Sequence, residues 1–218
     1  MTTPIKVDIW SDVQCPWCYI GKRKFEDGVA RSGVEVEVEY HSFELAPDTP
    51  VDFEGTPVDY LSAKYRTSRE QAQSMVDRVV SIAAEVGLDY DFDALQHTKT
   101  VKAHQLLHYA KQHGKQVEVK ERLLRAYFVE GRHVGRVEDL ADLAAEIGLD
   151  REDVLRSLQS NEFLDDVVAD QDLAIRYGIQ GVPFFVVDGK YGVSGAQSPE
   201  TFTSVLTKVA DERAAVAS

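Results

Sequence analysis

The sequence is short of positive charge. Its 218 residues include 24 lysine and arginine residues against 37 acidic ones, which leaves a net charge of −13. A chain this acidic repels a phosphate backbone and gains nothing from counterion release, so we expect no nucleic-acid partner. The simplest role of such a surface is to keep the protein in solution.

Long apolar runs and further cysteines are missing as well. No stretch of 18 apolar residues marks a membrane span, and the start MTTPIKVDIWSD lacks the basic and apolar regions of a secretory signal. We therefore expect a cytoplasmic protein without a membrane partner. Because thiols stay reduced there, the two cysteines, Cys15 and Cys18, suit catalysis or metal binding better than a structural disulfide.

The chain opens with a strand, a helix and a strand. Residues 5–10 alternate apolar with polar and predict a strand. Apolar residues then recur at helical spacing as far as Gly33, a typical helix stop. Residues 34–43 have a strict period of two, with valines on one face and glutamates on the other, which predicts a half-buried strand.

After Ala46 almost everything has helical spacing. Six helices are expected there, over residues 60–64, 67–86, 100–112, 116–130, 137–147 and 152–160. A helix over residues 163–177, strands over 183–187 and 190–194 joined by Asp188-Gly189, and a helix capped by Ser198 complete the chain. The predicted fold is an α/β layer of order β-α-β … α-β-β-α. Residues 1–46 and 162–218 form this layer, and an all-helical insertion domain at residues 47–161 interrupts it.

Cys15 and Cys18 stand at the junction of the first strand and the first helix. Pro16 suits the first helical turn, where its missing N–H is not needed. The Cys15 sulfur would then lie at a helix N-terminus, a position that lowers a thiol pKa. Cys18, one turn inside, is near enough to attack a mixed disulfide. This spacing predicts that Cys15 attacks and Cys18 resolves.

Two other interpretations of the pair stay open. A zinc site needs about two further ligands. His104 and His108 lie four residues apart on one predicted helix, but the glutamate of a zinc-peptidase motif is absent between them. An inert buried pair is the second alternative, although C-P-W-C at a strand-to-helix junction rarely arises by chance.

A proline stands at the start of the third strand. Because proline cannot donate to a ladder, Pro183 suits a strand edge or a first residue. A cis bond between Val182 and Pro183 would leave the Val182 backbone free to pair with an extended substrate. An ordinary trans proline is the alternative, and the sequence alone leaves both open.

These features resemble the thioredoxin superfamily, and within it the DsbA-like branch with an inserted helical domain. The segments SDVQCPWCYIGK, TKTVKAHQLLHYA and GVPFFVVDGKYGVSGAQ resemble the FrnE subgroup of cytoplasmic thiol–disulfide oxidoreductases, and the resemblance spans residue 5 to about residue 208. It implies Cys15 as the nucleophile, Cys18 as the resolving cysteine and Pro183 as a cis-proline beside them.

The same branch contains glutathione-dependent relatives, 2-hydroxychromene-2-carboxylate isomerase and the kappa-class glutathione transferase. They resemble this chain in architecture but carry serine where it has Cys15. Serine can activate the thiol of bound glutathione but cannot form a disulfide. The cysteine therefore favours an oxidoreductase, with glutathione left open as a co-substrate.

Five more residues are candidates for the site. Trp17 stands where strongly oxidising members of the branch carry histidine, so we expect a less oxidising pair with Pro16 and Trp17 against the substrate. His104 either lines the cleft as a proton shuttle or is structural. Gln197 either contacts a peptide or small molecule or belongs to a turn. Asp12 either raises the thiol pKa or caps the helix.

We therefore expect a thiol–disulfide oxidoreductase that acts on a protein or a small molecule carrying a thiol or a disulfide. No resident metal or organic cofactor is expected, and the protein is either a monomer or a homodimer. The alternatives are a glutathione-dependent isomerase or transferase and a redox-switched binding or chaperone module.

Overall fold

A computed structural model describes residues 3–216 of the chain. Four strands form one sheet in the order β2-β1-β3-β4. Their bounds are β1 (Ile5–Ser11), β2 (Val36–Ser42), β3 (Phe184–Val187) and β4 (Tyr191–Ser194). β2 runs parallel to β1, whereas β3 is antiparallel to both β1 and β4. This arrangement confirms the predicted α/β layer.

Local sequence sets the connections of the sheet. Helix α1 (Pro16–Ser32) ends at Gly33, whose φ of 63° is the left-handed conformation that glycine adopts without strain. Asp188 and Gly189 both have positive φ, 58° and 63°, as a two-residue hairpin turn of type I′ requires.

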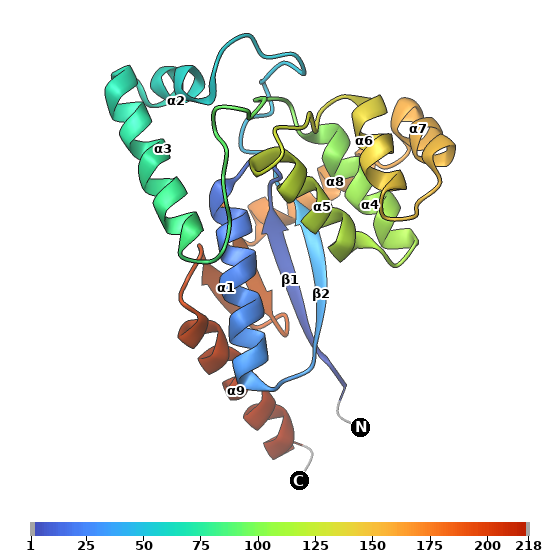
Figure 1. The fold of residues 1–218 in the computed structure, drawn as a ribbon. Coiled ribbons are helices and arrows are strands. Elements are labelled where there is room, and N and C mark those ends of the chain that lie inside the picture. The colour runs from blue at the N-terminus through green and yellow to red at the C-terminus, as the bar shows by residue number, and fades with distance from the viewer. Residues whose placement is uncertain (1–2, 217–218) are drawn as a thin grey trace.

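Helices cover the sheet on both faces (Figure 1). α1 and α9 (Pro199–Val216) pack on each other and on one face. The core between them is apolar and includes Ile5, Val7, Ile9, Phe25, Phe185, Phe202 and Leu206. α8 (Leu164–Arg176) lies against the other face, where Trp10 and Val186 pack on Ala174. The sheet is therefore the middle of three layers.

The segment between β2 and α8 is helical, as predicted. Its elements are α2 (Pro57–Tyr65), α3 (Arg69–Ala84), α4 (Val101–Gln112), α5 (Gln116–Phe128), α6 (Val137–Ala145) and α7 (Arg151–Ser160). Figure 1 shows α2 and α3 on one side and α4–α7 on the other, beyond the C-terminal ends of β1 and β2. Their apolar core continues into Val13, Tyr19 and Ile20. The helical segment and the sheet layer thus share a core around the cysteines.

Two findings complete the fold. In the described part of the chain, no helix combines the length and the hydrophobicity that a membrane crossing requires. The prediction of a half-buried strand holds only for the first half of β2, because His41 and Ser42 are buried together with Tyr40. Asp170 of α8 covers His41 on the face that the alternation assigned to solvent.

Candidate active site

Cys15 and Cys18 lie where the sequence predicted. Cys15 is the N-cap of α1, Pro16 is the first helical residue, and the Cys18 amide donates to the Cys15 carbonyl at 3.0 Å. Neither thiol is in a disulfide, and each cysteine is 3% exposed. The structure therefore shows a reduced pair at a helix N-terminus.

The loop before β3 approaches this pair closely. The Cys15 thiol donates to the Val182 carbonyl at 3.5 Å, and the Val182–Pro183 peptide bond is cis. A Cβ placed on Gly21 would come within 2.9 Å of Pro183 Cγ. Gly21 is therefore the residue that lets α1 carry the cysteines up to this loop.

A cavity of about 300 Å³ opens beside Cys15. It lies between the cysteine loop and α2, α3 and the chain around residue 95, and most of its lining is apolar or aromatic. Its residues include Cys15, Pro16, Trp17, Tyr60, Lys64, Val79, Phe92, His97, Phe128 and Val182. Trp17 is 37% exposed at its mouth, whereas Cys18 does not line it. An incoming molecule therefore meets Cys15 and not Cys18.

Two site residues carry no signal in the sequence. The Tyr90 hydroxyl donates to the Pro16 carbonyl at 2.7 Å and so ties the helical segment to the cysteine loop. The His97 ring lies 3.8 Å from the Tyr60 ring, and burial together with the charge of Lys64 lowers its pKa to about 4. His97 is therefore neutral at pH 7. Both residues belong to the irregular stretch between α3 and α4.

The prediction of a lowered Cys15 pKa is wrong for this reduced pair. The Cys15 thiol donates to Cys18 and is buried, and both effects raise the pKa of Cys15; the Asp12 carboxylate adds to them. Burial opposes the charge of Cys18, but the hydrogen bond from Cys15 and the positive charge of Lys120 outweigh it and lower the pKa of Cys18. Of the two thiols, Cys18 is therefore the more acidic in this reduced pair.

Asp12 and His104 form a fully buried pair beside the cysteines. The Asp12 carboxylate lies 3.3 Å from His104 Nε2 and accepts from the Leu45 amide at 2.7 Å. Burial opposes its ionisation, but the interaction with His104 outweighs burial and lowers the pKa of Asp12 to about 2. A full negative charge therefore lies behind the thiols.

Three residues predicted at the substrate site, Pro183, His104 and Gln197, do not line the cavity. His104 has no exposed surface because its ring turns inward to Asp12, so the prediction that it lines the cleft is wrong. Gln197 is exposed, and its side-chain amide donates to the Ser194 carbonyl at 2.8 Å, outside the cavity. The predicted residues that do line it together are Cys15, Pro16, Trp17 and Val182.

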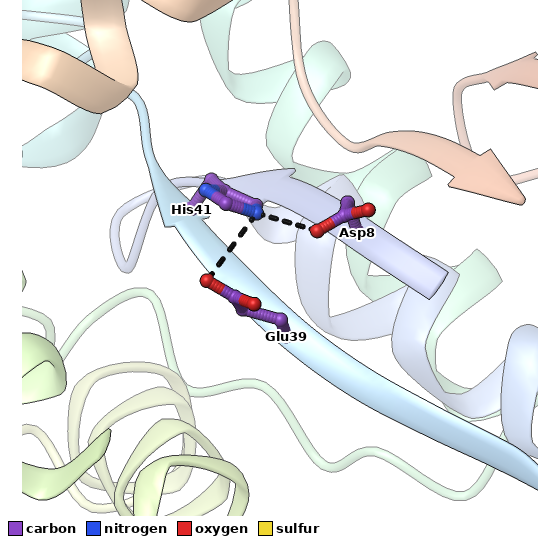
Figure 2. A group of neighbouring side chains, drawn as sticks. All are labelled: Asp8, Glu39 and His41. Carbon is purple, nitrogen blue, oxygen red and sulfur yellow. Dashed lines mark hydrogen bonds and ion pairs between the residues drawn. The ribbon is translucent and has the colours of Figure 1, made fainter. Parts of the chain in front are cut away.

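A second charged cluster lies on the neighbouring strands β1 and β2. Figure 2 shows the side chains of Asp8, Glu39 and His41, whose ligand-type atoms lie within 4.8 Å of one another. His41 Nε2 is 2.8 Å from Asp8 Oδ1, and its Nδ1 is 2.6 Å from Asp170 Oδ1. The close spacing of these three ligand-type atoms would suit a metal ion.

The charges of this cluster are already balanced. Lys6 lies 2.9 Å from Glu39 Oε2, and Lys111 pairs with the other oxygen of Glu39. Burial opposes a charge on His41, but Asp170 and Asp8 outweigh it and raise the pKa of His41 to about 9. Both ring nitrogens of His41 are paired with carboxylates, so in this structure the cluster is an ion-pair network that joins the sheet to α4 and α8.

Comparisons with known proteins agree with this geometry. A probable DsbA oxidoreductase of Streptomyces coelicolor is similar at 42% identity and TM-score 0.87, over 95% of this chain and 91% of that chain. The cytosolic disulfide reductase DsbM of Pseudomonas aeruginosa, solved with GSH, is 18% identical with TM-score 0.67, over 94% and 99% of the two chains. A 2-hydroxychromene-2-carboxylate isomerase is 17% identical with TM-score 0.75, over 98% and 100%.

The last two likenesses show the fold alone. A family model for the DSBA-like thioredoxin domain matches residues 6–207, which include both cysteines, Val182 and the whole helical segment. The chain belongs to the family of DsbA-like thioredoxin domains.

Proposed function

We propose that the protein is a thiol–disulfide oxidoreductase whose redox pair is Cys15 and Cys18. One observation carries the proposal. Cys15 is the cysteine that opens on the cavity, Cys18 is one helical turn behind it, and both are free thiols in a chain without further cysteines. That arrangement suits attack by one thiol and resolution by the other.

The reaction in the reducing direction starts from two thiols. Cys15 gives up its proton to solvent, and its thiolate attacks one sulfur of a substrate disulfide R–S–S–R. The first R–S⁻ leaves with the electron pair and takes a proton from water. Cys18, once deprotonated, attacks the Cys15 sulfur of the mixed disulfide and expels the second R–S⁻, which also takes a proton from water. The products are the Cys15–Cys18 disulfide and two thiols, and the reverse sequence oxidises a dithiol.

The surroundings of Cys15 indicate how a substrate would be held. Val182 offers backbone groups beside the reacting sulfur, while Pro16 and Trp17 offer apolar contact at the mouth of the cavity. We propose these three residues as substrate contacts. We also propose a reducing, cytoplasmic setting, which the cytosolic reductase of the same fold supports.

A glutathione-dependent isomerase or transferase is the second candidate. The solved isomerase shares the fold, and a cavity next to Cys15 is where a second reactant would lie. Lys64 is the one lysine or arginine among the residues that line this cavity. A tripeptide with two carboxylates finds little positive charge there, so glutathione suits the role of a passing reactant better than that of a bound cofactor.

Equilibration with glutathione redox buffers tests the proposal. The purified protein is quenched with acid, and intact mass counts the free thiols and any glutathione adduct. We expect a reversible loss of two hydrogens as the Cys15–Cys18 bridge forms, together with catalysed reduction of insulin. A stable glutathione adduct on Cys15 without a bridge would transfer the assignment to the glutathione-dependent class.

A further inference from the structure

Lys120 of α5 is a buried cation without a hydrogen-bond partner. It has no exposed surface, and its Nζ bonds to no other group among the residues that the structure describes. The nearest aromatic contact is the Tyr40 ring, with Nζ 5.5 Å from the centroid. A buried ammonium that lacks a partner costs several kcal/mol. The steps of the proposed reaction do not explain why Lys120 is buried.

The position of Lys120 is fixed from both sides. One turn earlier, the Gln116 amide bonds to both the backbone N–H and the carbonyl of Tyr40, each at 2.9 Å, and so docks α5 on β2. The next residue, Glu121, accepts from Tyr19 at 2.7 Å and lies 2.6 Å from Lys22, and so docks α5 on α1. Lys120 is thereby held between the strand and the helix that carries the cysteines.

The groups that interact electrostatically with Lys120, together with the Tyr40 ring that contacts it, come from three parts of the chain. Cys15, Cys18 and Lys22 belong to α1 and its cap, Asp12 belongs to the loop before α1, and Tyr40 belongs to β2. Burial lowers the pKa of Lys120, and the charge of Cys18 is the strongest of the interactions that oppose this change.

Two of these charges already have partners of their own. Lys22 is paired with Glu26 and Glu121, and the Asp12 carboxylate is held by His104. Cys18, the more acidic of the two cysteines, is the remaining group of this set that can carry a negative charge without a partner of its own.

We infer that Lys120 is the counter-cation of the cysteine pair, a positioning residue from the helical segment that completes the redox centre of the sheet layer. The inference rests on the proposed function and deepens it. Lys120 stabilises the state in which the reduced pair holds one thiolate. Disulfide formation removes that negative charge, so Lys120 favours the dithiol over the disulfide.

The test compares Lys120→Met with Lys22→Met. Both changes remove a buried cation near Cys18, but Lys22 already has two carboxylate partners. The ultraviolet absorbance of the thiolate in the reduced proteins is followed against pH. We expect Lys120→Met to move the midpoint upward by at least about one pH unit, a tenfold loss of thiolate at neutral pH. Its equilibrium with glutathione shifts toward the disulfide by about the same factor, whereas Lys22→Met changes neither.

If the thiolate absorbance has the same titration midpoint in the wild type and in Lys120→Met, the inference is wrong. If Lys120→Met does not fold, Lys120→Gln replaces it, and the Cys15→Ser variant supplies an independent reading on unmodified Lys120. In Cys15→Ser, Cys18 should titrate below the ordinary thiol value of about 8.5, and a midpoint at or above it contradicts the inference. Failure of the proposed function is a separate result. In that case Cys15 and Cys18 never form a disulfide in redox buffer. The midpoints of the thiolate titrations still report the charge of Lys120.

Discussion

Two groups of buried charges flank the same strands and are built differently. Around His41, every charged side chain has an oppositely charged neighbour: His41 lies between Asp8 and Asp170, and Lys6 pairs with Glu39. Around Cys18, Lys120 Nζ has no hydrogen-bond partner among the described residues. Buried polar groups are usually satisfied, so an unpartnered buried amine calls for an explanation, and a role in function is one.

The two clusters therefore do different work. The first holds the sheet to α4 and α8 and gains stability from fixed charges. The second keeps a cation and the Asp12 carboxylate near a thiol whose charge disappears on oxidation. Substitutions in the two clusters should therefore have different effects on stability and on disulfide exchange.

Loss of the cysteines separates attack from resolution. Cys15→Ala should lower the rate of insulin reduction by about a thousandfold or more, because the sulfur that meets the substrate is gone. Cys18→Ala should retain the first step and accumulate a mixed disulfide on Cys15, visible by intact mass. Urea unfolding of both variants should stay within about 2 kcal/mol of the wild type. Exchange at wild-type rates in Cys15→Ala would remove Cys15 from the mechanism.

His41→Gln should affect stability and leave disulfide exchange unchanged. The pKa of His41 rises from 6.5 to about 9 on folding, which corresponds to about 3 kcal/mol. Because the folded value is the higher one, this contribution is complete below pH 6.5 and is lost as the pH rises through 9. Urea unfolding at pH 6 and pH 10 measures it. The gap between the wild type and His41→Gln should close at pH 10, and a constant gap would contradict a charged His41.

Asp12→Asn should affect both stability and reactivity. The pKa of Asp12 falls from 3.8 to about 2 on folding, so its contribution of about 2 kcal/mol is present above pH 4 and is lost as the pH falls through 2. The Asp12 charge also raises the pKa of Cys15. Its removal should therefore speed alkylation of Cys15 by iodoacetamide several-fold at pH 7. Slower alkylation would show that Asp12 assists the thiolate instead.

Gln197→Ala should change insulin reduction by less than about twofold. The Gln197 amide bonds to its own turn at Ser194 and does not line the cavity. Trp17→Ala is the comparison, because Trp17 forms the cavity mouth and its loss should raise KM more than it lowers kcat. A larger effect from Gln197 than from Trp17 would move the substrate site toward the end of β4.

The elements and the cysteine positions could be predicted because their signals are local. Alternation marks β1 and the start of β2, and proline after Cys15 marks the start of α1. The ends of the expected helices differ from the observed ends by a few residues, since the last turns depend on capping. The family resemblance likewise rests on short contiguous motifs.

The rest of the site depends on residues far apart in the sequence. Tyr90, His97 and Lys120 follow the cysteines by many residues, and no spacing relates them to C-P-W-C. The pKa of Cys15 differs from the prediction because its interaction with Cys18 and its burial, which the sequence does not reveal, outweigh the helix N-terminus; the alternative that Asp12 raises this pKa agrees with the structure. His41 has the alternation of an exposed strand residue, and only the packing of α8 buries it.

The bond between Gln116 and Tyr40 has a consequence for self-association. β2 is an edge strand, and such edges offer unpaired backbone groups to other chains. Gln116 occupies the donor and the acceptor of Tyr40 at once, and the charged Lys111–Glu39 pair lies one residue away on the same strand. A foreign strand cannot extend the sheet there without displacing α5. The docking of α5 therefore closes this end of the β2 edge to the addition of a foreign strand.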